Sequence, residues 1–140
     1  MTQKLDGLIR YRKWELDEKR RNLAALQVML NGFKARAAAL EAEILAEQAH
    51  AAGAPEVAPA YGGYAVMAIE RRQTLARSIA DVKVKIADAE DEVREAFEEM
   101  KRFEIAAERR ARLAKQAAAR RQQNTLDELA LTIYRRRSRG

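Results

Sequence analysis

Apolar residues recur along the first part of the chain in alternating steps of three and four. The row consists of Leu5, Ile9, Leu16, Leu23, Leu26, Leu30, Phe33, Ala37, Leu40 and Ile44. Such a heptad row forms one apolar stripe on an α-helix and is typical of coiled coils. It predicts a helix over about residues 3–52.

A second row with the same spacing follows further along the chain. Its members are Leu75, Ile79, Val82, Ile86, Ala89, Val93, Ala96, Met100 and Phe103. It predicts a second helix over about residues 64–136. Between the rows the chain is interrupted by helix-breaking residues, namely Gly53, Pro55, Pro59, Gly62 and Gly63. These residues predict a loop over about residues 53–63.

Two long helices joined by a short linker fold back most simply as an antiparallel pair. We therefore expect an all-α fold, a long antiparallel two-helix coiled-coil hairpin with an overhanging basic C-terminal helical end. We expect residues 1–140 to form a single coiled-coil domain.

The register of the hairpin follows from the two rows, because the numbers of facing residues in an antiparallel pair add to a constant. A constant of 119 pairs large apolar side chains in five layers: Ile44 with Leu75, Leu40 with Ile79, Phe33 with Ile86, Leu26 with Val93, and Leu16 with Phe103. A constant of 112 sets Leu40 against Arg72 and is disfavoured for that reason. We therefore expect the register of 119.

This register leaves the C-terminal end of the second helix unpaired. Leu5 faces Ala114, so roughly 25 residues from Lys115 onward extend beyond the first helix, or about 38 Å of helix. The unpaired end carries an apolar stripe of its own and a group of arginines: Leu126, Leu129, Ala130, Ile133, Arg135, Arg136 and Arg137. The stripe predicts docking into a groove of a partner, with the arginines against acidic groups. Alternatively, the arginines cap the negative end of the helix dipole.

Long basic residues interrupt the seam near the termini. Arg12, Lys19 and Arg110 occupy positions that would otherwise be apolar. Either these side chains extend out of the seam with their charged ends in water, or a third surface packs there.

Two further features stand outside the heptad rows. Trp14 falls on the side of the first helix that points away from the second, where it either contacts a partner or packs along its own helix. Thr125 and Glu128 have the spacing of a capping box, so the second helix either restarts there or passes straight through.

Charge is concentrated at one end of the chain. The net charge is +6, and residues 109–140 hold ten Lys and Arg against two acids, a net of +8 that leaves −2 for the rest. Such an end suits an acidic protein surface, an anionic membrane or a nucleic acid. Nucleic acid is the least favoured partner, because the basic segment contains one aromatic residue, Tyr134, and no known binding module.

No motif for catalysis or cofactor binding is present. The chain has one histidine and no cysteine. Glu47 and His50 have the Glu-x-x-His spacing of di-iron bundles, but a di-iron site needs two such motifs. We expect no enzyme activity, no metal and no cofactor. Charged residues near the start and the lack of a long apolar run predict a soluble protein, and the lack of cysteine favours the reducing cytoplasm.

Both ends of the chain resemble the flagellar export protein FliJ family. The resemblance lies in "LDGLIRYRKWELDEKRRNLAAL" near the start, in "QQNTLDELA" near the end, and in the two helices between them. It implies a non-enzymatic coiled-coil component of the bacterial flagellar type III export apparatus. Members of that family form a stalk-like antiparallel coiled coil that engages an export ATPase hexamer, an export gate protein and export chaperones.

On this resemblance, Leu126, Asp127, Glu128, Leu129 and Ala130 lie in the segment that contacts the ATPase ring. It also implies a location in the cytoplasm, at the cytoplasmic face of the inner membrane at most. The alternatives are a scaffold coiled coil of another secretion system and an RNA-binding coiled-coil hairpin. A steep loss of affinity with salt would identify the RNA-binding alternative.

Overall fold

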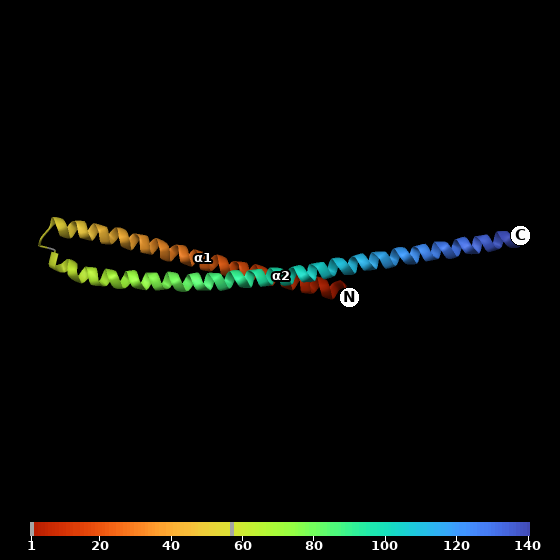
Figure 1. Cartoon of the computed structure of the whole chain (residues 1–140), viewed down its shortest axis with the longest axis horizontal. Coiled ribbons are helices and arrows are strands. Elements are labelled where there is room, and N and C mark those ends of the chain that lie inside the picture. Colours follow the sequence, from red (N-terminus) through yellow and green to blue (C-terminus); the bar gives the residue numbers. More distant parts are fainter. Residues whose placement is uncertain (1, 57) are drawn as a thin grey trace. The chain divides into compact units, whose positions relative to one another are not determined.

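The computed structural model describes every residue except Met1 and Val57, and for Thr2, Gln3 and Ala58 it describes the backbone alone. Two helices make up the fold, α1 over Thr2–Gly53 and α2 over Ala58–Arg139 (Figure 1). No strand occurs in the part of the chain that the structure describes. The prediction of two long packed helices is confirmed.

The chain divides into two compact units, which are described separately. Residues 14–96 form the first unit, an antiparallel hairpin made from the later part of α1 and the earlier part of α2, which run side by side in Figure 1. Residues 1–13 and 97–140 form the second unit, in which the first turns of α1 contact α2. That the two units act as one domain remains a prediction.

Ion pairs across the hairpin reveal a register different from the expected one. Arg72 pairs with Glu41, so the facing numbers add to 113. Lys19 pairs with Glu92, which adds to 111. The expectation of 119 is therefore wrong, and the helices pair close to 112, one heptad away.

Several large side chains of α1 lie opposite smaller side chains of α2 in this register. Ile44 and Ala68 belong to one buried cluster with Leu40, and Leu75 packs against its edge. The same register places the buried residues Ala96, Ala89 and Val82 opposite Leu16, Leu23 and Leu30. In these layers a small side chain leaves room for the large side chain opposite, so the two helices approach without crowding.

Arg72 explains why the register of 112 is tolerated. Its guanidinium leaves the seam and donates two hydrogen bonds to the Glu41 carboxylate, Nε to Oε1 at 2.7 Å and Nη2 to Oε2 at 2.9 Å. Both side chains are about half exposed, so the charge stays hydrated beside Leu40. The pattern of apolar positions makes Arg72 look like a clash with Leu40, because the pattern does not show that the long side chain can turn outward.

The connection between the helices is shorter than predicted. α2 begins at Ala58 instead of near residue 64, so Pro59, Gly62 and Gly63 lie inside the helix. Pro59 is tolerated because it occupies the first turn, where backbone N–H groups have no partner within the helix. The predicted loop over 53–63 is therefore wrong in extent.

The basic residues in the seam extend out of it towards acids on α2. Lys19 reaches Glu92 at 3.3 Å in the hairpin unit. In the other unit, Arg12 lies 3.9 Å from Glu99 and its guanidinium carbon lies 5.3 Å from the centre of the Phe103 ring. The structure supports extension out of the seam for Lys19, whereas Arg12 reaches Glu99 while its Nε stays buried.

The register can be tested with engineered disulfides, because the chain has no cysteine of its own. We expect cysteines at Ile44 and Ala68 to form a disulfide within one chain, since these side chains share a buried cluster. Cysteines at Leu40 and Ile79, which face each other only at 119, should remain reduced. Non-reducing electrophoresis and peptide mass mapping distinguish the two results, and the reverse pattern would restore the register of 119.

The core at the connection end can be tested by truncating two neighbouring side chains. Ile44 is 9% exposed and Leu45 is 67% exposed. We expect Ile44→Ala to lower the free energy of unfolding by about 2 kcal/mol, because it removes buried contacts and leaves a cavity. Leu45→Ala should change it by less than about 0.5 kcal/mol. Urea unfolding followed by circular dichroism measures both, and equal losses would contradict the described seam.

Candidate partner-binding surface

The terminal segment, residues 108–140, presents all of its side chains to solvent. Leu5 is the buried residue nearest the start of α1, and the register of 112 places it opposite Ala107, the last partly buried residue of α2. The uncovered helix therefore begins one heptad before the expected Lys115. From Glu108 to Arg139 it spans about 48 Å.

The predicted apolar stripe lies along one side of this segment. Leu126, Leu129 and Ile133 are 60%, 54% and 51% exposed, and Ala130 is exposed beside them. Their spacing of three and four residues keeps them on one side of the helix. An exposed row of large apolar residues on a single helix is suited to a partner surface.

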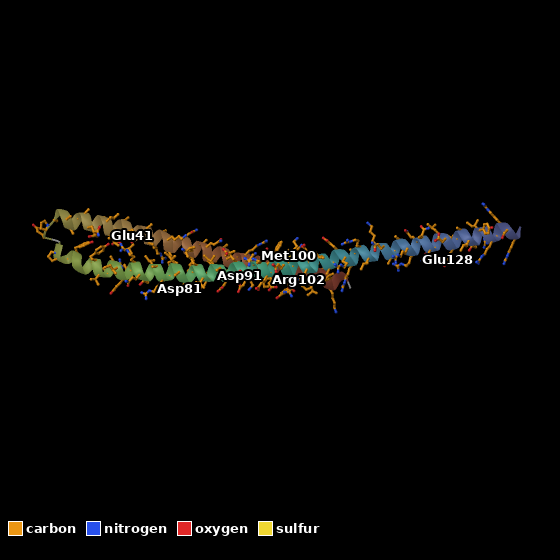
Figure 2. All side chains as sticks on the ribbon, in the orientation of Figure 1. Glu41, Asp81, Asp91, Met100, Arg102 and Glu128 are labelled. Atoms are coloured by element: carbon orange, nitrogen blue, oxygen red, sulfur yellow. The ribbon has the colours of Figure 1, made fainter. Side chains whose placement is uncertain are left out.

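Asp127 and Glu128 belong to other sides of the same helix. Successive residues turn by about 100°, so both carboxylates lie well away from Leu126. Gln123 donates a hydrogen bond from Nε2 to Asp127 Oδ1 at 3.1 Å, one turn away. Figure 2 labels Glu128 among side chains that project all around this part of α2. The segment therefore offers an apolar side and acidic sides to different contacts.

The helix passes through Thr125 without interruption. The Thr125 hydroxyl donates to the carbonyl oxygen of Arg121 at 2.9 Å, four residues earlier, as Thr132 does to Glu128. A capping residue would instead accept a hydrogen bond from a backbone N–H further along. The alternative of a helix restart at Thr125 is therefore excluded, and the stripe continues directly from the paired part of α2.

Arginines follow the stripe in the last turns of α2. Arg135, Arg136 and Arg137 are exposed, and the Ser138 hydroxyl donates to the carbonyl oxygen of Arg135 at 3.0 Å. Cations at this end of a helix interact favourably with the dipole. Their exposure also leaves them accessible to acidic groups, so the structure is compatible with both interpretations.

Ion pairs attach the start of α1 to α2 just before the terminal segment. Glu104 accepts a hydrogen bond from Lys101 at 3.0 Å, and Lys13 of α1 lies 3.7 Å from its other oxygen. The Lys101 hydrogen bond, aided by Lys13, holds the pKa of the Glu104 carboxyl below its ordinary value of 4.5. The Glu104 carboxylate therefore remains charged at neutral pH and pairs with both Lys101 and Lys13.

Trp14 belongs to the hairpin unit, whereas the terminal segment belongs to the other unit. Its side chain is exposed on α1, as the sequence predicts. A partner contact at Trp14 remains a prediction.

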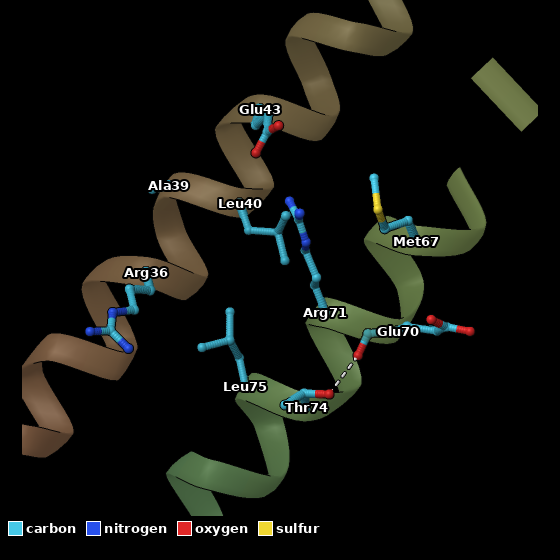
Figure 3. A pocket seen from close by; sticks show the side chains of 9 residues that line it. All are labelled: Arg36, Ala39, Leu40, Glu43, Met67, Glu70, Arg71, Thr74 and Leu75. Carbon is cyan, nitrogen blue, oxygen red and sulfur yellow. Dashed lines mark hydrogen bonds between the residues drawn. The ribbon is translucent and has the colours of Figure 1, made fainter. Parts of the chain in front are cut away.

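A groove that the sequence argument missed opens between α1 and α2 near the connection. It has a volume of about 640 Å³ and is lined from both helices, as Figure 3 shows. Leu40 and Leu75 approach each other across its floor, while Arg36, Glu43 and Arg71 surround it. The register of 119 hid this groove, because it set Leu40 against Ile79.

His50 lies in a smaller notch beside the connection. The rest of its lining is Glu47, Ala51, Ala60, Tyr61 and Tyr64. Burial raises the pKa of the Tyr64 phenol above 10.0, and the nearby Glu43 carboxylate raises it further. Among the described residues no cluster of three or more His, Cys, Asp or Glu could hold a metal ion.

One comparison with known proteins returned a match. The family model described as flagellar FliJ protein matches residues 1–139. No curated protein and no solved structure matches the chain. Among the described residues, no helix has the length and apolar character needed to span a membrane.

Proposed function

Because this chain belongs to the flagellar FliJ protein family and is thereby a component of the flagellar export apparatus, we propose that it acts as a stalk that couples to the export ATPase. The ATPase hexamer binds the terminal segment of α2. The export gate protein and export chaperones are further partners implied by the family. The proposed location is the cytoplasm, at the cytoplasmic face of the inner membrane when the apparatus is assembled.

The observation that carries this proposal is the fully exposed terminal segment with its apolar stripe. A stalk needs a length of helix that its own hairpin leaves uncovered, and about 48 Å of α2 meets this need. Leu126, Leu129 and Ile133 supply the apolar anchors that dominate binding energy when they become buried in a partner.

Continuity of α2 supports a coupling role. α2 is a single helix of 82 residues, so a load on the terminal segment passes along its backbone into the part that packs against α1. Lys13 and Arg12 of α1 pair with Glu104 and Glu99 of α2 where the uncovered helix begins. These contacts resist separation of the two helices at the point where a docked partner would act.

The arginines and the net charge of residues 109–140 favour an acidic partner surface. That segment carries ten basic residues against two acids. Complementary charge accelerates the encounter between two proteins, while the apolar stripe sets how long the complex lasts. We propose that Arg135, Arg136 and Arg137 meet carboxylates of the ATPase.

A pull-down from cells with the full chain as bait tests the function. We expect the export ATPase in the eluate at moderate salt. Recovery of nucleic acid instead, or of neither, would contradict the proposal. The matched control is a bait with Leu129→Asp and Ile133→Asp, because this variant should keep the fold and the basic end while losing the apolar stripe.

Aspartates in the stripe should separate binding from folding. We expect Leu129→Asp combined with Ile133→Asp to shift the thermal midpoint of the free protein little, because both side chains are exposed. The same variant should no longer stimulate or assemble the export ATPase, since docking would bury the new charges. Circular dichroism melting and ATPase assays measure the two effects.

A control pair carries the same chemical change on another side of the segment. Leu113 and Leu131 are exposed leucines that lie off the stripe. Leu113→Asp with Leu131→Asp should leave ATPase stimulation intact. If the stripe variant instead unfolded several degrees earlier and kept its binding, the stripe would stabilise the chain's own fold.

Neutralising the arginines should act mainly on the rate of association. We expect replacement of Arg135, Arg136 and Arg137 by alanine to slow association with the ATPase about tenfold at low salt. The difference in association rate between the variant and the parent should shrink as salt rises, because screening also slows the association of the parent. Surface plasmon resonance over a salt series checks this, and an unchanged association rate would show that these arginines only cap the helix.

A further inference from the structure

The connection end of the hairpin carries a charge opposite to that of the whole chain. Residues 37–70 contain five acids and no lysine or arginine, a net of −5, whereas the chain as a whole has +6. The acids are Glu41, Glu43, Glu47, Glu56 and Glu70. We propose that this end, where α1 turns back into α2 (Figure 1), binds a basic segment of a partner protein and takes one of its arginines into the notch beside the connection.

The notch combines aromatic rings with a carboxylate. Its lining residues are Glu47, His50, Ala51, Ala60, Tyr61 and Tyr64, and its volume is about 180 Å³. This volume is about six times the share of one water molecule in the liquid, so the planar end of an arginine side chain fits into it. The Tyr61 and Tyr64 ring centroids lie 6.1 Å apart, with the ring planes tilted by 37°. Tyrosine faces attract a cation that lies within about 6 Å of the ring centroid, and arginine is the cation found there more often.

Glu47 supplies the negative charge of the notch. Glu41 is already paired with Arg72, but no residue that the structure describes forms an ion pair with Glu47. Glu47 is also half-buried, so its carboxylate has lost part of its hydration. A guanidinium that donates two hydrogen bonds to such a carboxylate is bound more tightly than at a fully exposed acid. The notch therefore favours arginine over a neutral side chain of the same shape.

Tyr64 adds a hydrogen-bonding group that the chain leaves unused. Its hydroxyl oxygen is buried and has no hydrogen-bond partner in the part of the chain that the structure describes. Buried polar groups in proteins are normally hydrogen-bonded, so an unsatisfied hydroxyl favours the binding of a donor. A guanidinium carries five N–H donors, enough to serve both the Glu47 carboxylate and a hydroxyl oxygen.

The groove near the connection continues the notch along the same side of α1, which favours a protein segment over a small cation. Leu40 and Glu43 line the groove, Glu47 and His50 line the notch, and their spacing of three and four residues keeps all four on one side of the helix. The groove holds two arginines and two glutamates, so its charges balance, and Leu40 and Leu75 form its apolar floor (Figure 3). Leu40 and Glu47 are seven residues apart, or about 10.5 Å along α1. A helical partner segment therefore places an apolar side chain in the groove and an arginine two turns away in the notch.

An NMR titration of the full chain with two peptides tests the site. The probe is a helical peptide of alanine and glutamine that carries one leucine and one arginine seven residues apart, made with either residue first. We expect it to shift the backbone amide signals of Glu47, His50, Tyr61 and Tyr64. In the matched peptide citrulline replaces the arginine, which keeps the shape and removes the charge. We expect the citrulline peptide to bind about tenfold more weakly.

Four variants separate the parts of the notch. Glu47→Gln should weaken binding of the arginine peptide about tenfold. Glu56→Gln, the same change at an exposed acid outside the notch, should weaken it less than about twofold. Tyr61→Leu should weaken binding about threefold because it removes a ring face, and Tyr61→Phe should keep the affinity of the parent. Circular dichroism melting of each variant checks that the hairpin is intact.

Equal binding of the arginine and citrulline peptides would overturn the proposal, as would equal weakening by Glu47→Gln and Glu56→Gln. The chain's own terminal segment is also basic, so a second copy is the other occupant to test. Sedimentation equilibrium of the chain alone provides this test. Self-association that Glu47→Gln abolishes would show that a second copy occupies the notch, and it would overturn the assignment to a partner protein.

The notch belongs to the hairpin unit, whereas the proposed ATPase contact belongs to the other unit, so each can fail without the other. Peptide binding that depends on Glu47, in a chain that does not stimulate the ATPase, would reject the proposed function and leave the notch as a binding site. ATPase stimulation by a chain that does not bind the arginine peptide would reject the notch and leave the proposed function standing.

Discussion

The arrangement of the chain depends on the fit between branched side chains of α1 and alanines of α2. Ile44 packs with Ala68, and the register sets Leu16 opposite Ala96, so each of these two layers contains one large and one small side chain. Slipping by one heptad would set large against large in these layers and push the helices apart. This fit fixes where the cover provided by α1 ends, and therefore how much of α2 is free to bind a partner.

The periodic pattern predicted the helices but could not by itself predict their register. A heptad row matches itself after every shift of seven residues, so the choice between 119 and 112 depended on single residues. Arg72 favoured the wrong register, 119, because at 112 its charge was expected to lie in the apolar seam against Leu40. The long side chain instead turns outward to Glu41, a freedom that a count of apolar positions ignores.

The errors in loop and register are connected. If α2 began near residue 64, a long flexible loop would allow the helices to meet at 119. With α2 starting at Ala58, that register would stretch the connection across roughly 15 Å, close to the full extension of its five peptide links. Pro59 does not break the helix as predicted, because a proline in the first turn of α2 removes no hydrogen bond within the helix.

Much of the candidate surface could be predicted from the sequence, because it depends on the spacing of residues along a single helix. The stripe of Leu126, Leu129 and Ile133 follows from spacing on one helix, which no tertiary contact alters. The groove beside Leu40 and Leu75 depends on how two helices align, so it was accessible only after the register was known. Thr125 shows the same limit, because a capping-box spacing is also compatible with an uninterrupted helix.

The short connection between Gly53 and Ala58 also limits how far α1 can extend along α2. α1 has a set number of residues, so its first turn reaches only as far along α2 as the turnaround point allows. A connection lengthened enough to advance α1 by one heptad would transfer about 10.5 Å of α2 from the free part to the covered part. The connection between the helices therefore determines the length of α2 that is free to bind a partner, although the connection itself need not contact that partner.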